Sequence, residues 1–226
     1  MAVYTKLDKE KINFILSNYS LGDIKKFEGI KEGIENTNYF IKTEKNKFIL
    51  TIYEKRVEEK DLPFFIGLMK NLHNSNFKCP EPIINKNGNY ISEILGKKAC
   101  VVSYINGFSK KNLNPQNCFE IGVATAKLHK ITEKLTSKRV NKLSLHSWKL
   151  LFTKIENECA KINKDLPKII KNSLIEIEKN WPKNLPSGII HADLFPDNIF
   201  FKNNKLTGII DFYFSCNDFY AFEIAV

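Results

Sequence analysis

Arginine is nearly absent from this sequence. Only Arg56 and Arg139 are arginines among the 35 basic residues, so the net charge of +10 comes almost entirely from lysine. The densest lysine pairs, at 25–26, 97–98 and 110–111, lie far apart along the chain. A face that binds nucleic acid normally clusters its basic residues. The scattered charge therefore argues against nucleic-acid binding, which stays open only as a weaker alternative.

Paired cysteines and long apolar runs are missing as well. The five cysteines are an odd number and none forms a C-x-x-C pair, which favours reduced cysteines in the cytoplasm over a disulfide framework or a zinc site. The N-terminus lacks the basic-then-apolar pattern of a signal peptide, and no apolar run approaches the ~18 residues of a membrane span. We therefore expect a cytoplasmic protein without membrane association.

The pattern along the chain changes once, near its middle. Strand-like segments dominate up to Ile105, and helical patterns dominate from Asn106–Gly107 to about Trp181. With 226 residues, of which 43% are hydrophobic, the chain can form two small lobes around a cleft. We expect an α+β fold with a sheet-rich lobe over residues 1–105 and a mostly helical lobe over residues 106–226.

Local signals predict the individual elements. The expected helices are 5–19 with a capping box of Thr5 and Asp8, one from Asp61, one from Pro115 capped by Asn114, 147–162 and 167–181. The expected strands are 24–27, 38–43, 48–53, 99–105, 189–190, 199–201 and 206–210. The second and third strands, and the last two, are expected to pair as hairpins.

The strongest chemical signal is an Asp, an Asn five residues later and a second Asp thirteen residues after that. These residues are Asp193, Asn198 and Asp211, each beside a short apolar run. Carboxylate and amide oxygens at the ends of buried strands suit a magnesium–nucleotide site, as in protein-kinase catalytic loops. Such residues also start turns and cap helices. The strand context favours the catalytic interpretation, with His191 as a hydrogen-bonded scaffold residue.

A polar loop between the first two expected strands is the second candidate element. It runs from Gly29 through Gly33 to Asn38. Glycines at these positions would let backbone N–H groups approach phosphates. An ordinary hairpin turn would look similar, but the position just before the second strand favours a phosphate-binding loop.

Over essentially its whole length the sequence resembles the bacterial homoserine kinases of the aminoglycoside phosphotransferase and choline kinase superfamily. The stretches that carry the resemblance are 33–40, 48–56, 61–69, 191–198 and 210–218. The resemblance implies a protein-kinase-like fold that moves the γ-phosphoryl group of ATP to the hydroxyl of L-homoserine. The product would be O-phospho-L-homoserine, on the route to threonine.

The same resemblance implies a role for each motif residue. Asp193 would be the catalytic base, and Asn198 and Asp211 would hold Mg²⁺. The segment 101–105 would be the hinge between the lobes that touches adenine. The implied nucleotide-binding residues are Gly29, Gly33, Asn36, Asn38, Val102 and Tyr104. ATP and Mg²⁺ are thus the expected cofactors.

Two departures from the family pattern stand out. Thr51 occupies the position where a strand lysine or arginine usually contacts the α- and β-phosphates, and Lys42 or Lys55 would have to substitute. Family members also continue well past Val226, so we expect a fragment whose helical lobe is incomplete at its C-terminus. Near that end, Glu223 occupies a position where the superfamily often has an Asp that supports the catalytic loop.

Two further alternatives remain at this point. One is another small-molecule kinase of the same fold, acting on choline, an aminoglycoside or methylthioribose. The other is an inactive nucleotide-binding fragment, which the missing strand lysine favours and the intact Asp193, Asn198 and Asp211 oppose.

Overall fold

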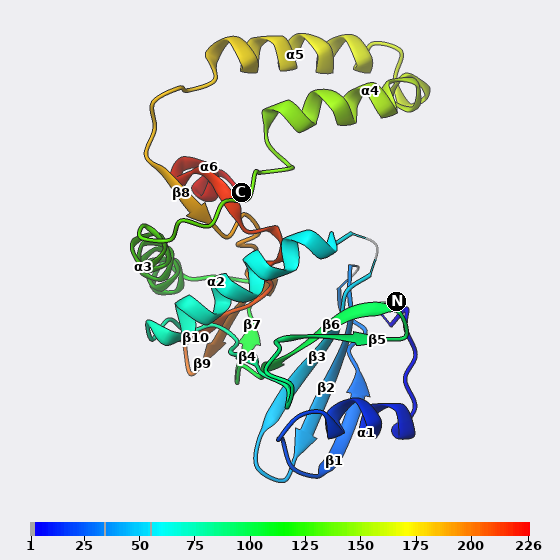
Figure 1. Ribbon diagram of the computed structural model, residues 1–226. Coiled ribbons are helices and arrows are strands. Elements are labelled where there is room, and N and C mark those ends of the chain that lie inside the picture. The colour runs from blue at the N-terminus through cyan, green and yellow to red at the C-terminus, as the bar shows by residue number, and fades with distance from the viewer. Residues whose placement is uncertain (1–2, 34, 55) are drawn as a thin grey trace.

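An antiparallel sheet organises the first half of the chain (Figure 1). The computed structural model describes residues 3–33, 35–54 and 56–226. The sheet runs in the order β1-β2-β3-β6-β4, with β5 also paired to β6. Its strands are β1 (Ile24–Gly29), β2 (Thr37–Thr43), β3 (Lys47–Ile52), β4 (Pro82–Ile83), β5 (Ile91–Ile94) and β6 (Lys97–Ser103). The expected hairpin of the second and third strands is confirmed, with Asn38 opposite Thr51.

The two faces of this sheet contribute to different cores. Side chains alternate along a strand, so Leu50 and Val101 pack with helix α1 (Lys9–Ser17) on one face. Cys100 and Val102 point to the other face and pack with helix α2 (Leu62–Asn74), which follows the short 3₁₀ helix η1 (Glu59–Asp61). Burial on both faces explains why β3 and β6 are rich in apolar residues.

The start of α1 corrects one prediction. The helix begins at Lys9, where Asp8 caps it by accepting the backbone N–H of Lys11 at 2.8 Å. Thr5 takes no part in a capping box, because its hydroxyl donates to Glu54 at 2.8 Å and its N–H to the Thr37 hydroxyl at 3.1 Å. Contacts with the sheet therefore override the local capping signal.

The second half of the chain combines helices with two small sheets. Its elements are β7 (Phe108–Ser109), α3 (Pro115–Thr132), α4 (Leu145–Ile162), α5 (Leu166–Asn180), β8 (Ser187–Ile190), η2 (Pro196–Asn198), β9 (Ile199–Lys202), β10 (Lys205–Ile209), η3 (Phe212–Phe214), β11 (Cys216–Phe219) and α6 (Tyr220–Ala225). Asn114 caps α3 as predicted, accepting the N–H of Asn117 at 2.8 Å. The predicted β9–β10 hairpin is confirmed, whereas β11 was not predicted.

The strand pairing of β7 supports the proposed division of the chain after Ile105. β7 pairs with β9 and extends the sheet β10-β9-β7, so residues just beyond the proposed boundary join the second half. β11 pairs with β8 in a separate ladder.

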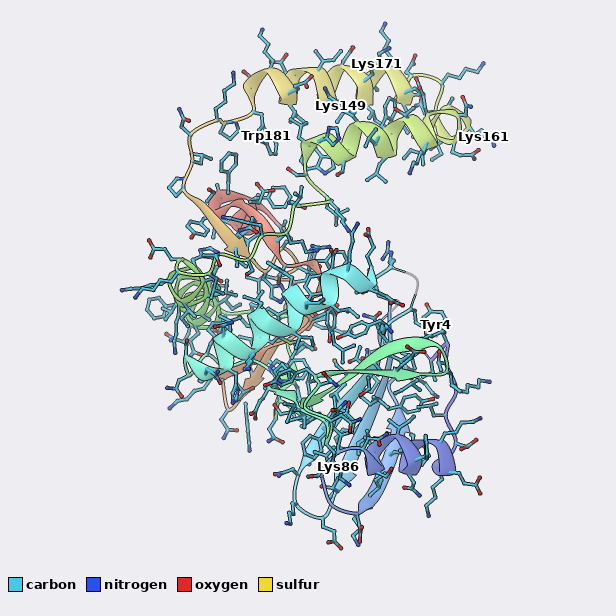
Figure 2. All side chains as sticks on the ribbon, viewed as in Figure 1. Tyr4, Lys86, Lys149, Lys161, Lys171 and Trp181 are labelled. Carbon is cyan, nitrogen blue, oxygen red and sulfur yellow. The ribbon has the colours of Figure 1, made fainter. Side chains whose placement is uncertain are left out.

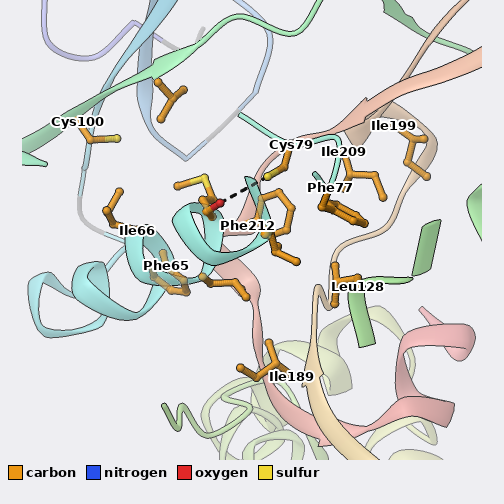
Figure 3. Close-up of a cluster of buried hydrophobic side chains, with 14 of the residues drawn as sticks. Phe65, Ile66, Phe77, Cys79, Cys100, Leu128, Ile189, Ile199, Ile209 and Phe212 are labelled. Atoms are coloured by element: carbon orange, nitrogen blue, oxygen red, sulfur yellow. Dashed lines mark hydrogen bonds between the residues drawn. The ribbon is translucent and has the colours of Figure 1, made fainter. Parts of the chain in front are cut away.

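One hydrophobic core joins the two halves (Figure 3). Phe65 of α2 and Cys100 of β6 belong to the same buried cluster as Leu128 of α3, Ile189 of β8 and Phe212 of η3. Burying a large apolar side chain contributes about 1.5–3 kcal/mol. The loops that follow β8 and β10 therefore start from a shared, well-packed base.

Helices α4 and α5 form a hairpin that projects from the rest of the molecule (Figure 1). Lys149 and Lys161 on α4, Lys171 on α5 and Trp181 mark it in Figure 2. Only Cys159 is buried on α4, and α5 has no buried residue. None of the helices in the described ranges is long and apolar enough to cross a membrane.

Candidate active site

Asp193 and Asn198 lie on the loop between β8 and β9. The side-chain amide of Asn198 donates to the Asp193 carboxylate and to the Asp193 backbone carbonyl, both at 2.8 Å. These bonds orient the carboxylate and leave the amide oxygen of Asn198 without a hydrogen bond to any described residue. Burial raises the pKa of Asp193 to about 6 against the opposing effect of Asn198, and the nearby carboxylates of Glu35 and Asp197 add to the rise.

Asp211 follows β10 and lies close to the same loop. The Ile210 N–H donates to the Asn198 carbonyl at 2.9 Å, which brings Asp211 alongside Asn198. Asp211 adopts a left-handed backbone conformation with φ 65°. Its Oδ1 atom is buried and has no hydrogen-bond partner among the residues described. Burial, together with the charges of Asp193 and Glu35, raises the pKa of Asp211 to about 7.

The free oxygens of Asp211 and Asn198 fit a magnesium ion. Within the described ranges, no group of three His, Cys, Asp or Glu side chains could hold a metal ion unaided. Mg²⁺, however, is usually bound by one or two protein oxygens and completed by substrate phosphates and water. A buried carboxylate oxygen without a partner is costly unless a cation or a donor meets it. The donor set therefore suits Mg²⁺ in the presence of a nucleotide.

The backbone before Asp193 is held by a buried carboxylate. Glu223 of α6 accepts the N–H of His191 at 2.5 Å and that of Ala192 at 3.3 Å. Ala192 has φ 63°, a conformation that non-glycine residues rarely adopt. The buried His191 ring contacts the Ile210 carbonyl through Nε2 at 2.9 Å, and burial lowers its pKa, which favours the neutral ring. These are the contacts expected of a scaffold histidine and of a supporting Glu223.

His129 of α3 packs beside Glu223. Its ring stacks on Tyr220 with centroids 4.1 Å apart, and its Nε2 lies 3.7 Å from Glu223. The helix therefore helps to confine Glu223 beside the loop that carries Asp193.

The two glycines of the segment from Gly29 to Asn38 differ in backbone conformation and in the space around them. Gly33 has φ 90° and open space around it, so its backbone is accessible. Gly29 is extended, and an added Cβ would lie 2.8 Å from a methyl group of Val3, so close packing of the N-terminal segment requires glycine here. Residue 34 of this loop lies outside the described residues.

Asn36 and Asn38 already have structural partners. The buried Asn36 side chain accepts the N–H of Glu54 at 3.3 Å. The Asn38 side chain accepts a hydrogen bond from the hydroxyl of Thr51 at 2.8 Å. Asn38 therefore contacts the residue that stands in place of the usual strand lysine or arginine. Both asparagines shape the start of β2.

The expected hinge residues differ in exposure. Val102 is buried in the core, while Tyr104 is partly exposed and packs edge-on against Phe40 with centroids 5.2 Å apart. The Tyr104 N–H donates to the Lys47 carbonyl at 3.1 Å, and the Ser103 N–H donates to the Glu81 carbonyl at 2.8 Å. An adenine ring would therefore have to use other backbone groups of this segment.

Arg56 is a cation near the loop that the sequence reasoning missed. It pairs with Glu35, whose charge reaches both Asp193 and Asp211. Lys42 lies opposite Lys47, about 16 Å along β2 from Thr37 at the usual rise of a strand. Lys55 lies outside the described residues. The sequence signal that could have indicated this cation is the position of Arg56, one of only two arginines, just after the third expected strand.

Comparison with known sequences places the chain among phosphotransferases. Residues 26–226 match the model of the family described as "Phosphotransferase enzyme family". The chain is 43% identical to a homoserine kinase of Xanthobacter autotrophicus and 41% identical to one of Agrobacterium fabrum. Both similarities cover 100% of this chain and 70% of the relative.

Solved structures of low sequence identity share the fold. An amicoumacin kinase bound to AMP-PNP, Ca²⁺ and amicoumacin superposes with a TM-score of 0.75 at 14% identity, over 97% of this chain and 68% of the other. A spectinomycin phosphotransferase bound to ADP and spectinomycin has a TM-score of 0.76 at 14% identity, over 97% and 73%. The expected kinase-like α+β fold, with a sheet in the first half and mostly helices in the second, is confirmed.

The buried charge of Asp211 predicts a pH-dependent stability in the absence of metal. A carboxyl whose pKa is raised by folding binds its proton more tightly in the folded state, so stability falls as pH rises from about 4 through about 7. Asp211→Asn removes this penalty. The melting temperature of metal-free Asp211→Asn should exceed that of wild type by at least about 3 °C at pH 8, and the gap should shrink at pH 5.

Differential scanning calorimetry from pH 5 to 8 measures this gap, and the exposed Asp165 supplies a matched control. Asp165→Asn should follow wild type at every pH. A gap between Asp211→Asn and wild type that did not change with pH would show that the Asp211 carboxylate is not the source of the penalty.

Proposed function

This chain belongs to the homoserine kinases of the phosphotransferase enzyme family, and we propose that it transfers the γ-phosphoryl group of ATP to the hydroxyl of L-homoserine. The product is O-phospho-L-homoserine, an intermediate of threonine biosynthesis. The observation that carries the proposal is the pairing of Asp193 with Asn198 beside the unpartnered Asp211 in a chain 43% identical to a homoserine kinase.

Asp193 is the proposed catalytic base. Its carboxylate is half-buried and held by Asn198, and its pKa of about 6 is close to neutral pH, where a general base works well. It orients the homoserine hydroxyl for in-line attack and accepts the hydroxyl proton late, because phosphoryl transfer depends mainly on positioning and charge stabilisation.

Asn198 and Asp211 are the proposed magnesium ligands. Bound Mg²⁺ would offset the negative charge of the phosphate oxygens. Before binding, burial raises the pKa of both Asp193 and Asp211, and the charge of Asp193 raises the pKa of Asp211 further. Asp193 and Asp211 thus form a negatively charged site, whose charge the magnesium of a bound metal–nucleotide complex would offset.

The loop from Gly29 to Asn38 is proposed to cover the phosphates, with the open backbone at Gly33 as its closest approach. Asn36 and Asn38 would act by shaping this loop. Val102 and Tyr104 would border adenine, Val102 through its buried side chain and Tyr104 from the edge of the hinge segment.

Homoserine is favoured over the acceptors of related kinases. The relatives at 41–43% identity are homoserine kinases, whereas the antibiotic kinases are only 14% identical and indicate the fold alone. An acceptor panel with ATP and Mg²⁺ tests the choice: L-homoserine, L-serine, choline, kanamycin and methylthioribose, with products followed by ³¹P NMR. We expect kcat/KM for L-homoserine to exceed the others by at least about 100-fold. Faster phosphorylation of another acceptor would reject homoserine.

Asp193→Asn tests the catalytic role. The amide keeps the shape but cannot accept the hydroxyl proton, so kcat should fall by about 10²–10⁴-fold, while the ADP affinity should stay within about twofold of wild type because Asn198 and Asp211 are unchanged. Steady-state kinetics and calorimetric titration of ADP with Mg²⁺ measure the two effects. Asp197→Asn, on the exposed part of the same loop, is the matched control and should remain active. Equal turnover of both variants would exclude Asp193 as the base.

A further inference from the structure

A buried cluster of two hydroxyls and a thiol connects the sheet to the segment after Asp211. Tyr53, just beyond β3, has its hydroxyl 2.9 Å from the thiol of Cys100 on β6. The same hydroxyl donates to the hydroxyl of Tyr213 in η3 at 3.2 Å, and the Cys100 thiol lies 3.8 Å from Tyr213. None of these groups takes part in the proposed reaction, and burying polar groups is unfavourable unless they bond one another.

Aromatic contacts confine Tyr213 further. Its ring meets Tyr53 edge-on at 5.1 Å and Phe65 of α2 edge-on at 5.7 Å. The Arg139 guanidinium covers Phe65 at 4.7 Å and donates to the carbonyls of Phe214 and Ser215 at 3.2 and 3.0 Å. The turn that follows Asp211 is therefore held from the sheet, from α2 and from the segment after α3.

Tyr213 lies two residues beyond the proposed metal ligand. Asp211 immediately precedes η3 and makes no side-chain capping bond to it, and the nearby Tyr213 N–H only opposes the rise in the pKa of the Asp211 carboxyl. Asp211 also has a left-handed backbone and an Oδ1 atom without a partner among the described residues, so the direction of its carboxylate depends on how the turn that contains Tyr213 is held. A shift of Tyr213 would therefore move the carboxylate that holds the metal.

We propose that Tyr53 is a positioning residue, whose hydroxyl fixes Tyr213 and thereby aims the Asp211 carboxylate at the metal–nucleotide complex. The inference rests on the proposed role of Asp211 in Mg²⁺ binding. It couples the sheet that carries the phosphate loop to the metal-binding segment, so that both face the nucleotide in one arrangement. Cys100 completes the polar cluster and keeps the Tyr53 hydroxyl in place.

Tyr53→Phe removes the hydroxyl and keeps the ring. We expect KM for ATP and the Mg²⁺ concentration at half-maximal rate to rise by roughly threefold to tenfold, with KM for L-homoserine unchanged within twofold. Tyr19→Phe is the matched control, because Tyr19 is equally buried at 4% exposure and also makes a 2.9 Å hydroxyl contact, with Ser92 on the far face of the sheet. It should leave all three values at wild-type level.

The carboxyl ¹³C resonance of Asp211 in metal-free protein gives a readout that does not depend on turnover. It should move in Tyr53→Phe and stay in place in Tyr19→Phe. Tyr53→Phe could instead melt at a lower temperature while its Asp211 resonance, its KM for ATP and its Mg²⁺ dependence match those of Tyr19→Phe. That result would show that Tyr53 contributes only packing, and the proposal would be wrong. If the resonance moves but wild type phosphorylates no homoserine, the positioning role holds and the proposed function fails.

Discussion

The site depends on a carboxylate that the protein buries and does not neutralise. Asp211 is held in a left-handed turn with one oxygen unpaired among the described residues, and burial, with the charges of Asp193 and Glu35, raises its pKa to about 7. Such an arrangement is unfavourable in isolation, and proteins retain it where a ligand supplies the missing charge. The rest of the site fits this constraint: Asn198 turns its amide nitrogen toward Asp193, and its amide oxygen makes no hydrogen bond to a described residue.

Keeping two repelling carboxylates near each other requires a rigid base. The core shared by α2, α3 and the strands β8 to β10 supplies it, since Phe212 and Ile189 beside the two loops are almost fully buried. Glu223 anchors the loop before Asp193 through two backbone N–H groups, and Tyr53 and Arg139 anchor the segment after Asp211. The two loops are thus held by separate contacts, one through α6 and the other through Tyr53 and Arg139.

The sequence predicted which motif residues lie together better than it predicted the contacts around them. The spacing of Asp193, Asn198 and Asp211 was readable because hairpin strands must bring these positions together, and β9 and β10 do so. The Tyr53–Cys100–Tyr213 cluster and the pairing of Arg56 with Glu35 were not readable, because they join residues far apart in the chain without a local pattern. The predicted capping role of Thr5 was wrong for the same reason. Its hydroxyl bonds to Glu54, which lies 49 residues away and which no local capping pattern could indicate.

The position of a divalent cation tests this description most directly. Crystals grown with ADP and Mn²⁺, measured at the manganese absorption edge, locate the ion by its anomalous scattering. We expect a peak about 2 Å from an Asp211 oxygen and from the side-chain oxygen of Asn198, completed by phosphate oxygens. An ordered ADP with manganese bound elsewhere, and the Asp211 carboxylate facing protein donors instead, would contradict it.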